Sequence, residues 1–430
     1  MTNVSNKKNK IDIIVKKILF TLSILIIYRV CSFIPMPCVD LGKINSFFEV
    51  SKGGFFNVFN AFSGGAIGRV SIFSLGIMPY ITASIIVQLI TSTSPEFKKM
   101  KKEGGDAMQE KFNQYTKLLS IVVATVQGIS LSTFLLSSNI TTLDATTFTC
   151  LIVMTTITST FILLWFANRI SQNGIGNGIS LIVFTGIVAE MPKDIVNIFT
   201  LAKNGTIQPL SMALIFILFV VSILCVILFE KSNRLVHIQY PRQVMQHINQ
   251  TKQQVPHFIP MKINPAGVMP PIFSNALLIL PTTIVSLFKN SDNQVISFII
   301  KHFTHGTLFF IIANIALISF FCFFYNNVVF DANEVSDQLR KSNIFIPGTR
   351  PGQQTAELLK KIMNKLSIIG SIYLGFICSV PEFFAPKYGY SFFIGGTGLL
   401  IVVNVISDTI AAIQSHMLPS KYDNKKKVYH

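Results

Sequence analysis

The stretch that decides the fold runs from Phe59 to Ile90 and reads FNAFSGGAIGRVSIFSLGIMPYITASIIVQLI. Its second half is apolar enough for a membrane helix, whereas its first half is weak, rich in glycine and carries Arg69. Irregular backbone at membrane depth is tolerated only beside protein or water, so an interrupted span is a pointer to a transport pathway. The stretch therefore indicates a membrane protein that moves something across the bilayer.

The composition supports this interpretation. The chain has 430 residues, of which 50% are hydrophobic and 13% charged, and its mean hydropathy is +0.55. A soluble domain of this size needs more charge to cover its surface. The formal net charge of +17 first suggests cytoplasmic loops and anionic lipid, and only then acidic partners.

Ten apolar runs are candidates for membrane spans of about 20 residues each. The fifth run is short, and we expect Met191 and Pro192 to close it. Ten spans also divide into five plus five near residue 205, although no clear internal repeat is visible in the sequence. The runs are 18–35, 72–93, 118–137, 148–168, 179–190, 208–229, 266–288, 306–330, 366–381 and 392–415.

The distribution of basic residues predicts the orientation. If the N-terminus is cytoplasmic, 27 of the 36 Lys and Arg residues lie on the inner side, as the positive-inside rule requires. Both termini are then cytoplasmic. Two inner loops, 230–264 and 331–365, are long and polar. They are either docking sites for partners or solvated loops that hold the orientation.

The sequence contains no common catalytic or metal-binding pattern. It has no P-loop, HExxH or GxSxG motif, and its six cysteines form no CxxC pair, which predicts inert core thiols and no metal site. No acid or lysine of the kind a proton-coupled carrier uses stands at the middle of a span. A polypeptide channel is the leading interpretation, a secondary transporter for small solutes is the alternative, and an intramembrane enzyme lacks a catalytic constellation.

Several long motifs resemble the SecY family of bacterial protein-translocation channels, in the family's order and from end to end of the chain. They are the opening stretch, GIGNGISLIVFTGIVA (174–189), KINPAGVMPPIF (262–273), IPGTRPGQQT (346–355), FICSVPEFF (376–384) and GGTGLLIVV (395–403).

The resemblance implies an all-α polytopic membrane protein. Ten transmembrane helices would form two five-helix halves, residues 1–205 and 206–430, related as an inverted pseudo-repeat around an hourglass pore. The implied function is a protein-conducting channel that moves unfolded preproteins across the membrane and membrane helices laterally into it. Partners would drive the movement, and no cofactor is implied.

The resemblance also implies that residues 60–71, in the N-terminal half, are a plug, a short helix that blocks the closed channel. Glycines lower the stability of a helix and remove bulk, so such a segment can pack closely and release easily. The alternative is that the glycines only allow close helix packing. The expected plug residues are Asn60, Phe62, Ser63, Gly64, Gly65, Gly68 and Arg69.

A ring of aliphatic side chains is implied at the waist of the pore. Such a constriction resists ions by dewetting, yet makes no specific hydrogen bond to a passing chain. The lateral gate would lie between spans two and seven, with help from spans three and eight. The ring positions are Ile81, Ile85, Ile179, Val183, Ile272 and Ile401.

The two long loops of the C-terminal half become docking sites in this resemblance. The implied partners are the ribosome, including its RNA, the SecA motor, SecE- and SecG-like subunits, signal sequences and nascent chains, and membrane lipid. The implied location is the inner (cytoplasmic) membrane of a cell, with an organelle membrane of bacterial origin as the alternative. The expected docking residues are Arg234, Arg242, Lys341 and Arg350.

The predicted topology is testable by cysteine labelling from outside intact cells. A probe placed near residue 143 or 295 should be labelled, because both positions follow outward-going spans. A probe near residue 250 or 350 should stay unlabelled. External labelling at 350 would contradict the orientation.

Overall fold

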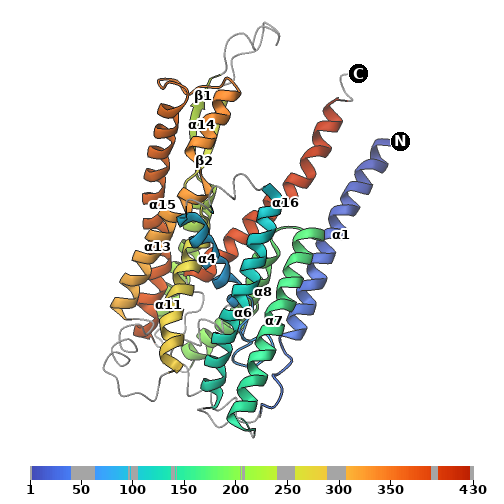
Figure 1. Cartoon of the computed structure of the whole chain (residues 1–430), viewed down its shortest axis with the longest axis vertical. Helices are drawn as coiled ribbons and strands as arrows, with labels where there is room; N and C mark the ends of the chain where they lie inside the picture. The colour runs from blue at the N-terminus through green and yellow to red at the C-terminus, as the bar shows by residue number, and fades with distance from the viewer. Residues whose placement is uncertain are drawn as a thin grey trace. The chain divides into compact units, whose positions relative to one another are not determined.

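The computed structural model describes residues 2–39, 63–94, 97, 105–136, 141, 143–203, 205, 209–239, 257–287, 307–388 and 396–426 (Figure 1). Each of the ten predicted spans overlaps a helix. These helices are α1 (Thr2–Cys31), α4 (Met78–Thr93), α6 (Gly105–Leu136), α7 (Ala145–Asn173), α8 (Gly178–Lys203), α9 (Pro209–Lys231), α11 (Met269–Leu287), α13 (Leu308–Val329), α15 (Gln353–Tyr388) and α16 (Gly396–Lys426).

Length and composition mark several of these helices as able to cross a membrane. Met78–Thr93 is a shorter apolar helix. Among the described residues, five stretches are long and apolar enough: Glu110–Leu136, Ala145–Asn173, Leu308–Lys341, Gln353–Pro381 and Gly396–Ser415.

Two predicted boundaries are wrong. The fifth span does not close at Pro192, because α8 continues through this proline to Lys203. Proline removes one backbone hydrogen bond, but its fixed φ is compatible with a helix, and membrane helices tolerate it. The second helix begins at Met78 rather than near residue 72, with Pro79 in its first turn. Proline costs no helix hydrogen bond there, because N–H groups of the first turn have no acceptor within the helix.

Contacts between residues divide the chain into two compact units. Unit 1 comprises Met1–Met212, Asn275–Ile311 and Pro381–His430, and unit 2 comprises Ala213–Ser274 and Ile312–Val380. The proposed division into halves at residue 205 stays a prediction.

Unit 1 is built around α7. Helix α6 packs against α4 and α7, α8 packs against α7 and α16, and α1 packs against α7 and α8. The helices approach closely at glycines: a Cβ added at Gly128 of α6 would lie 2.7 Å from the hydroxyl oxygen of Thr156 on α7. Small residues at such crossings let membrane helices gain dispersion contacts.

Unit 2 contains two strands and a short helix that the sequence analysis did not predict. Strand β1 (Asn233–Ile238) pairs antiparallel with β2 (His257–Lys262), and α14 (Ala332–Lys341) follows α13. An isolated bridge joins Gln239 to Phe345, beyond β1. Strands, loop and the start of α15 share one apolar cluster: Val236, Ile238, Met261, Ile346, Leu359, Met363 and Leu366.

Buried hydrogen bonds join the helices of unit 2. The hydroxyl of Ser274 on α11 and the side-chain oxygen of Asn314 on α13 are 2.6 Å apart. The Asn326 amide of α13 donates to the Ser367 hydroxyl of α15 at 2.6 Å. In an apolar medium such bonds fix how helices face one another.

The contact between α7 and α8 gives a prediction about stability. A Cβ on Gly178, the first residue of α8, would lie 2.8 Å from the Ala167 Cα of α7 and closer still to the Ala167 carbonyl group. Backbone cannot move aside like a flexible side chain, so Gly178→Ala should lower the free energy of unfolding by about 1–3 kcal/mol.

The measurement is the midpoint of thermal unfolding in detergent. Gly375→Ala on α15 is the matched control, because the nearest atom to its added Cβ is Ile315 Cγ2 at 3.4 Å, an ordinary contact. The control should be as stable as the parent or slightly more so, since alanine favours a helix. A Gly178→Ala variant with the parent's midpoint would contradict the packing.

Candidate functional site

The segment between the loop after α1 and the start of α4, residues 63–77, is a succession of turns. We call it the pre-α4 segment. The loop after α1 holds its middle by backbone hydrogen bonds: the Met36 N–H donates to Val70 O at 2.8 Å, and the Ile72 N–H donates to Ile34 O at 3.0 Å. The expected short plug helix is therefore wrong for residues 63–71, although the segment does fold back onto the protein.

Apolar side chains bury the segment in unit 1. Ala66, Ile67 and Val70 are at most 1% exposed. The Phe73 ring lies 5.9 Å, centroid to centroid, from the ring of Tyr28 on α1. Val70 and Leu75 also join one cluster with side chains of α6 and α7: Leu131, Leu135, Phe148 and Ile152.

Two glycines adopt backbone conformations that other residues avoid. Gly64 has φ 67° and Gly65 has φ 77°, in the left-handed region where a Cβ is strained. A Cβ on Gly64 would also lie 2.9 Å from Gly186 Cα of α8, and a Cβ on Gly65 would collide with the carboxylate of Glu190 on the same helix. These glycines remove bulk as predicted, and they are also required by the turn itself.

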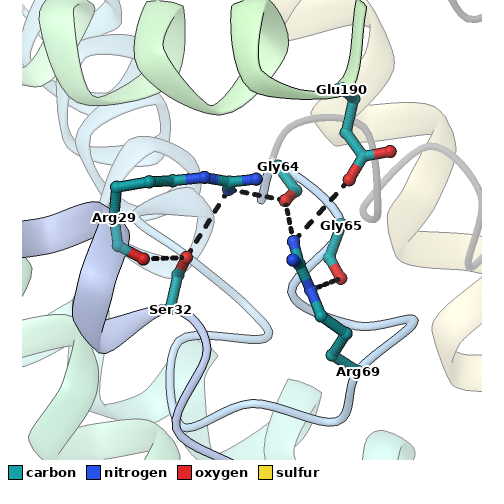
Figure 2. Close-up of polar contacts among 6 residues, drawn as sticks. All are labelled: Arg29, Ser32, Gly64, Gly65, Arg69 and Glu190. Carbon is teal, nitrogen blue, oxygen red and sulfur yellow. Dashed lines mark hydrogen bonds and ion pairs between the residues drawn. The ribbon is translucent and has the colours of Figure 1, made fainter. Parts of the chain in front are cut away.

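Two guanidinium groups converge on the carbonyl of Gly64 (Figure 2). Arg29, in the last turn of α1, donates to this oxygen through Nη1 at 2.7 Å. Arg69 donates to the same oxygen through Nη2 at 2.7 Å and to Gly65 O through Nε at 3.1 Å. The carbonyls of the turn, which lack helical partners, are thereby satisfied by charged donors.

Glu190 of α8 faces this pair of cations. Its Oε1 lies 3.7 Å from Arg69 Nη2, and the two side chains are 10% and 33% exposed, respectively. Figure 2 shows the carboxylate approaching from α8 on the side of the turn opposite Arg29. Three separate elements of unit 1, namely α1, the pre-α4 segment and α8, thus contribute charge to one site.

An aromatic ring and the local charges complete the environment of Arg69. Its guanidinium lies 4.2 Å from the centroid of the Phe33 ring, and that of Arg29 lies 5.2 Å from the same centroid, which is cation–π geometry. The Glu190 carboxylate is the anion next to these cations, 3.7 Å from Arg69 Nη2.

The sequence prediction found only part of this site. Gly64, Gly65 and Arg69 contribute directly, Ser63 and Gly68 belong to the same segment, and Asn60 and Phe62 lie outside the described residues. Arg29 is not singled out by any sequence motif. The sequence prediction does not include Glu190, because it ends the fifth span at that residue, although an acid inside an apolar helix is a signal of function.

The six predicted pore residues all lie on described helices, and five of them belong to unit 1. Ile85 on α4, Val183 on α8 and Ile401 on α16 are buried. Ile81, Ile179 and Ile272 are half-buried. Their grouping into one ring stays a prediction.

The predicted docking residues belong to unit 2, where three of them can be described. Arg234 on β1, Lys341 at the end of α14 and Arg350 are exposed, and Arg242 lies outside the described residues. The loop around Arg350 is well anchored: the Thr355 hydroxyl donates to Arg350 O at 2.9 Å, and the Ser336 hydroxyl donates to Gly352 O at 2.7 Å. The guanidinium thus projects from a backbone that side chains hold in place.

The cysteines form neither disulfides nor, among the described residues, a metal site. None of the six is paired in a disulfide, and the described residues contain no group of three His, Cys, Asp or Glu side chains that could hold a metal ion. The expectation of core thiols is correct for Cys322 and Cys378, which are buried, but wrong for Cys38 and Cys150, which are exposed.

Comparison with known proteins gives the family. The SecY family model matches residues 71–410. The chain belongs to the SecY family. A SecY-family relative, the protein translocase subunit SecY of Rickettsia typhi, is 39% identical over 427 residues, which are 98% of this chain and 98% of the relative. As a member of this family, the chain is a multi-pass membrane protein and a protein translocase subunit.

Solved SecY-family structures have the same fold. A SecY channel whose plug domain stabilises the closed state and maintains a membrane seal aligns with a TM-score of 0.67 and 18% identity, over 94% of this chain and 92% of that chain. Sec61 from the canine ribosome–channel complex aligns with a TM-score of 0.63 and 16% identity, over 94% and 93% of the two chains. The fold is that of a protein-conducting channel.

Proposed function

We propose that this chain forms a passive, plugged channel through which unfolded preproteins cross the inner (cytoplasmic) membrane and nascent membrane helices leave into lipid. The channel itself catalyses no reaction, and the energy comes from its partners. The observation that carries the proposal is the seating of the pre-α4 segment: an irregular, glycine-turned segment lies buried between helices of unit 1 and is held there by side chains.

Residues 60–71 are the plug in this proposal. Non-helical backbone at membrane depth has to be enclosed by protein or line a water-filled cavity, and the described residues 63–71 are enclosed. The contacts that hold them are polar in part, because Arg29 and Arg69 satisfy the carbonyls of Gly64 and Gly65. Water in an open channel can replace these hydrogen bonds, so the carbonyls of the segment still have donors after it leaves.

The constriction is formed by the six aliphatic side chains that the family motifs place at the waist: Ile81, Ile85, Ile179, Val183, Ile272 and Ile401. Within unit 1, helix packing and burial keep several of these side chains in place. Helix α8 packs against α16, and Ile85, Val183 and Ile401 are buried. An aliphatic ring excludes ions by dewetting and accepts any side chain of a passing polypeptide.

Clients that are themselves apolar helices leave through a lateral gate between α4 and α11. The backbone before α11 favours such a role, because Gly267 has φ 59° and Pro270 and Pro271 stand in the first turn. These residues weaken the local hydrogen-bond ladder. Opening the gate exchanges contacts between helices for contacts between helix and lipid of similar apolarity.

Both termini and the two long loops face the cytoplasm, as the distribution of Lys and Arg predicts. There the exposed cations of unit 2 meet the ribosome and a SecA-type motor, while small SecE- and SecG-like subunits complete the complex. The ribosome-bound state of the similar canine Sec61 supports the first of these partners. Arginine suits both ribosomal RNA and acidic protein surfaces, because its planar fork donates bidentate hydrogen bonds.

A polar substitution at the constriction tests the channel. Ile401→Asn should raise ion leak and relax the demand for a strong signal sequence, because a polar side chain wets the ring. The measurements are conductance in planar bilayers and export of a client with a weakened signal. Ile401→Leu keeps the site apolar, and Ile406→Asn introduces the same polar group at an exposed position of α16. Both controls should behave like the parent, and parental conductance of Ile401→Asn would oppose the assignment.

Arg350 tests the docking surface. A charge-assisted bidentate contact is worth roughly 1.5–3 kcal/mol, so Arg350→Glu should weaken engagement of the motor by about one to two orders of magnitude. Arg350→Lys should fall between the two, because lysine keeps the charge but loses the fork. The measurement is the translocation rate in vesicles with motor and ATP.

Lys111→Glu is the matched control for this charge reversal, because Lys111 is an exposed cation on α6 of unit 1 and lies outside the two docking loops. It should translocate like the parent. Equal rates for Arg350→Lys and the parent would show that only positive charge matters at position 350, and would end the bidentate interpretation.

A further inference from the structure

Two positive charges meet at the Gly64 carbonyl, and Glu190 supplies a negative charge that partly offsets them. Arg29 and Arg69 both donate to one oxygen at 2.7 Å, so two positive groups are held close together in a partly buried place. Like charges at this separation repel, and the repulsion grows as water is removed. The described anion at the site is the Glu190 carboxylate, 3.7 Å from Arg69 Nη2.

The three charged groups belong to different elements of unit 1. Arg29 belongs to α1 and Glu190 to α8, which pack against each other directly, whereas Arg69 belongs to the pre-α4 segment. When that segment leaves its seat, only Arg69 moves away. The attraction of Glu190 for Arg69 therefore acts on the position of the segment, and Arg29 contributes both an attractive hydrogen bond to Gly64 and a repulsion toward Arg69.

We propose that Glu190 is a positioning residue that latches the plug: its carboxylate offsets part of the positive charge of the Arg29–Arg69 pair, holds Arg69 in the seat and so sets how easily the channel opens. The proposal rests on the proposed role of residues 60–71 as the plug. It adds a residue outside the plug, on α8, whose charge determines the balance between the closed and open states.

The geometry suits a contact that has to break repeatedly. Arg69 and Glu190 are 3.7 Å apart, which is an ion pair but longer than a direct hydrogen bond. Arg69 is one-third exposed, so water and salt weaken the attraction. A fully buried, bidentate pair would hold the segment too tightly to be released by an entering polypeptide.

The test neutralises Glu190 without changing its shape. The full chain, purified from membrane with the subunits that accompany it, carries Glu190→Gln. Two readouts are measured in parallel: ion conductance in planar bilayers, and labelling of an Ile67→Cys probe by a water-soluble maleimide. Ile67 is 1% exposed in the seated segment, and the exposed Cys38 and Cys150 are first replaced by serine.

The latch predicts that Glu190→Gln raises both the open fraction and the rate of labelling by about fivefold to thirtyfold, because two cations are left facing each other without an anion. Glu190→Asp keeps the charge and should stay within about twofold of the parent, since a carboxylate one methylene shorter still faces the pair. Glu110→Gln, an identical neutralisation at an exposed position of α6, should have no effect on either readout.

A double-substitution cycle separates the latch from a general structural role of Glu190. In an Arg69→Gln background the carboxylate has lost its ion-pair partner, so adding Glu190→Gln should cause no further leak or labelling. Additive effects of the two substitutions would overturn the latch, because they would mean that Glu190 supports α8 independently of Arg69.

Deletion of residues 63–69 separates the latch from the plug itself. If the deletion raises conductance while Glu190→Gln leaves both readouts at the parental level, the plug stands and the latch is wrong. If the deletion leaves conductance unchanged, the plug and the latch are both wrong. The plug and the latch are both supported if Glu190→Gln increases leak and labelling while Glu190→Asp and Glu110→Gln behave like the parent.

Discussion

A backbone carbonyl at membrane depth needs a hydrogen-bond donor, because hydrocarbon supplies none. Helices meet this requirement within themselves, and most of the described chain is helical. The pre-α4 segment cannot, because Gly64 and Gly65 turn its backbone into the left-handed region. Arg29 and Arg69 supply the donors instead. The arginines bring positive charge, and this charge in turn explains the carboxylate of Glu190 and the nearby Phe33 ring.

The proposed channel combines two surfaces with opposite chemistry. The aliphatic positions on α4, α8, α11 and α16 make no specific bonds, which suits a constriction that has to accept every side chain. The seat of the segment is specific, with charged donors directed at named carbonyls. The proposed seat combines polar contacts with apolar burial, so a client that brings water and polar backbone can compete for its polar part.

In unit 2, too, apolar packing and polar recognition are carried by different residues. Its apolar cluster joins β1, β2, the loop at Ile346 and the start of α15, so the exposed Arg234 and Arg350 stand on one packed body. A partner that pulls on these cations therefore pulls on a rigid support rather than on a free loop. Rigid support preserves the aim of a guanidinium fork, which matters more for arginine than for lysine.

Much of the architecture could be predicted from the sequence. Hydrophobic runs located all ten membrane helices, although the fifth run is shorter than a full span, because the hydrocarbon thickness leaves little choice of element. The family motifs directed attention to Gly64, Gly65 and Arg69. Helix ends were less predictable: a proline inside the membrane did not stop α8 at residue 192, and the polar segment 332–341 formed a helix that hydropathy does not reveal.

The sequence alone determined the family, the number of membrane helices and the glycine-rich segment, because these follow from local composition and from the order of motifs. Only the tertiary structure decided that Arg29, Arg69 and Glu190 meet. They lie on three elements far apart in the chain, and each alone is one charge near the end of an apolar run. Helix packing brings α1 and α8 together beside the segment, and this places the charges of Arg29, Arg69 and Glu190 in one site.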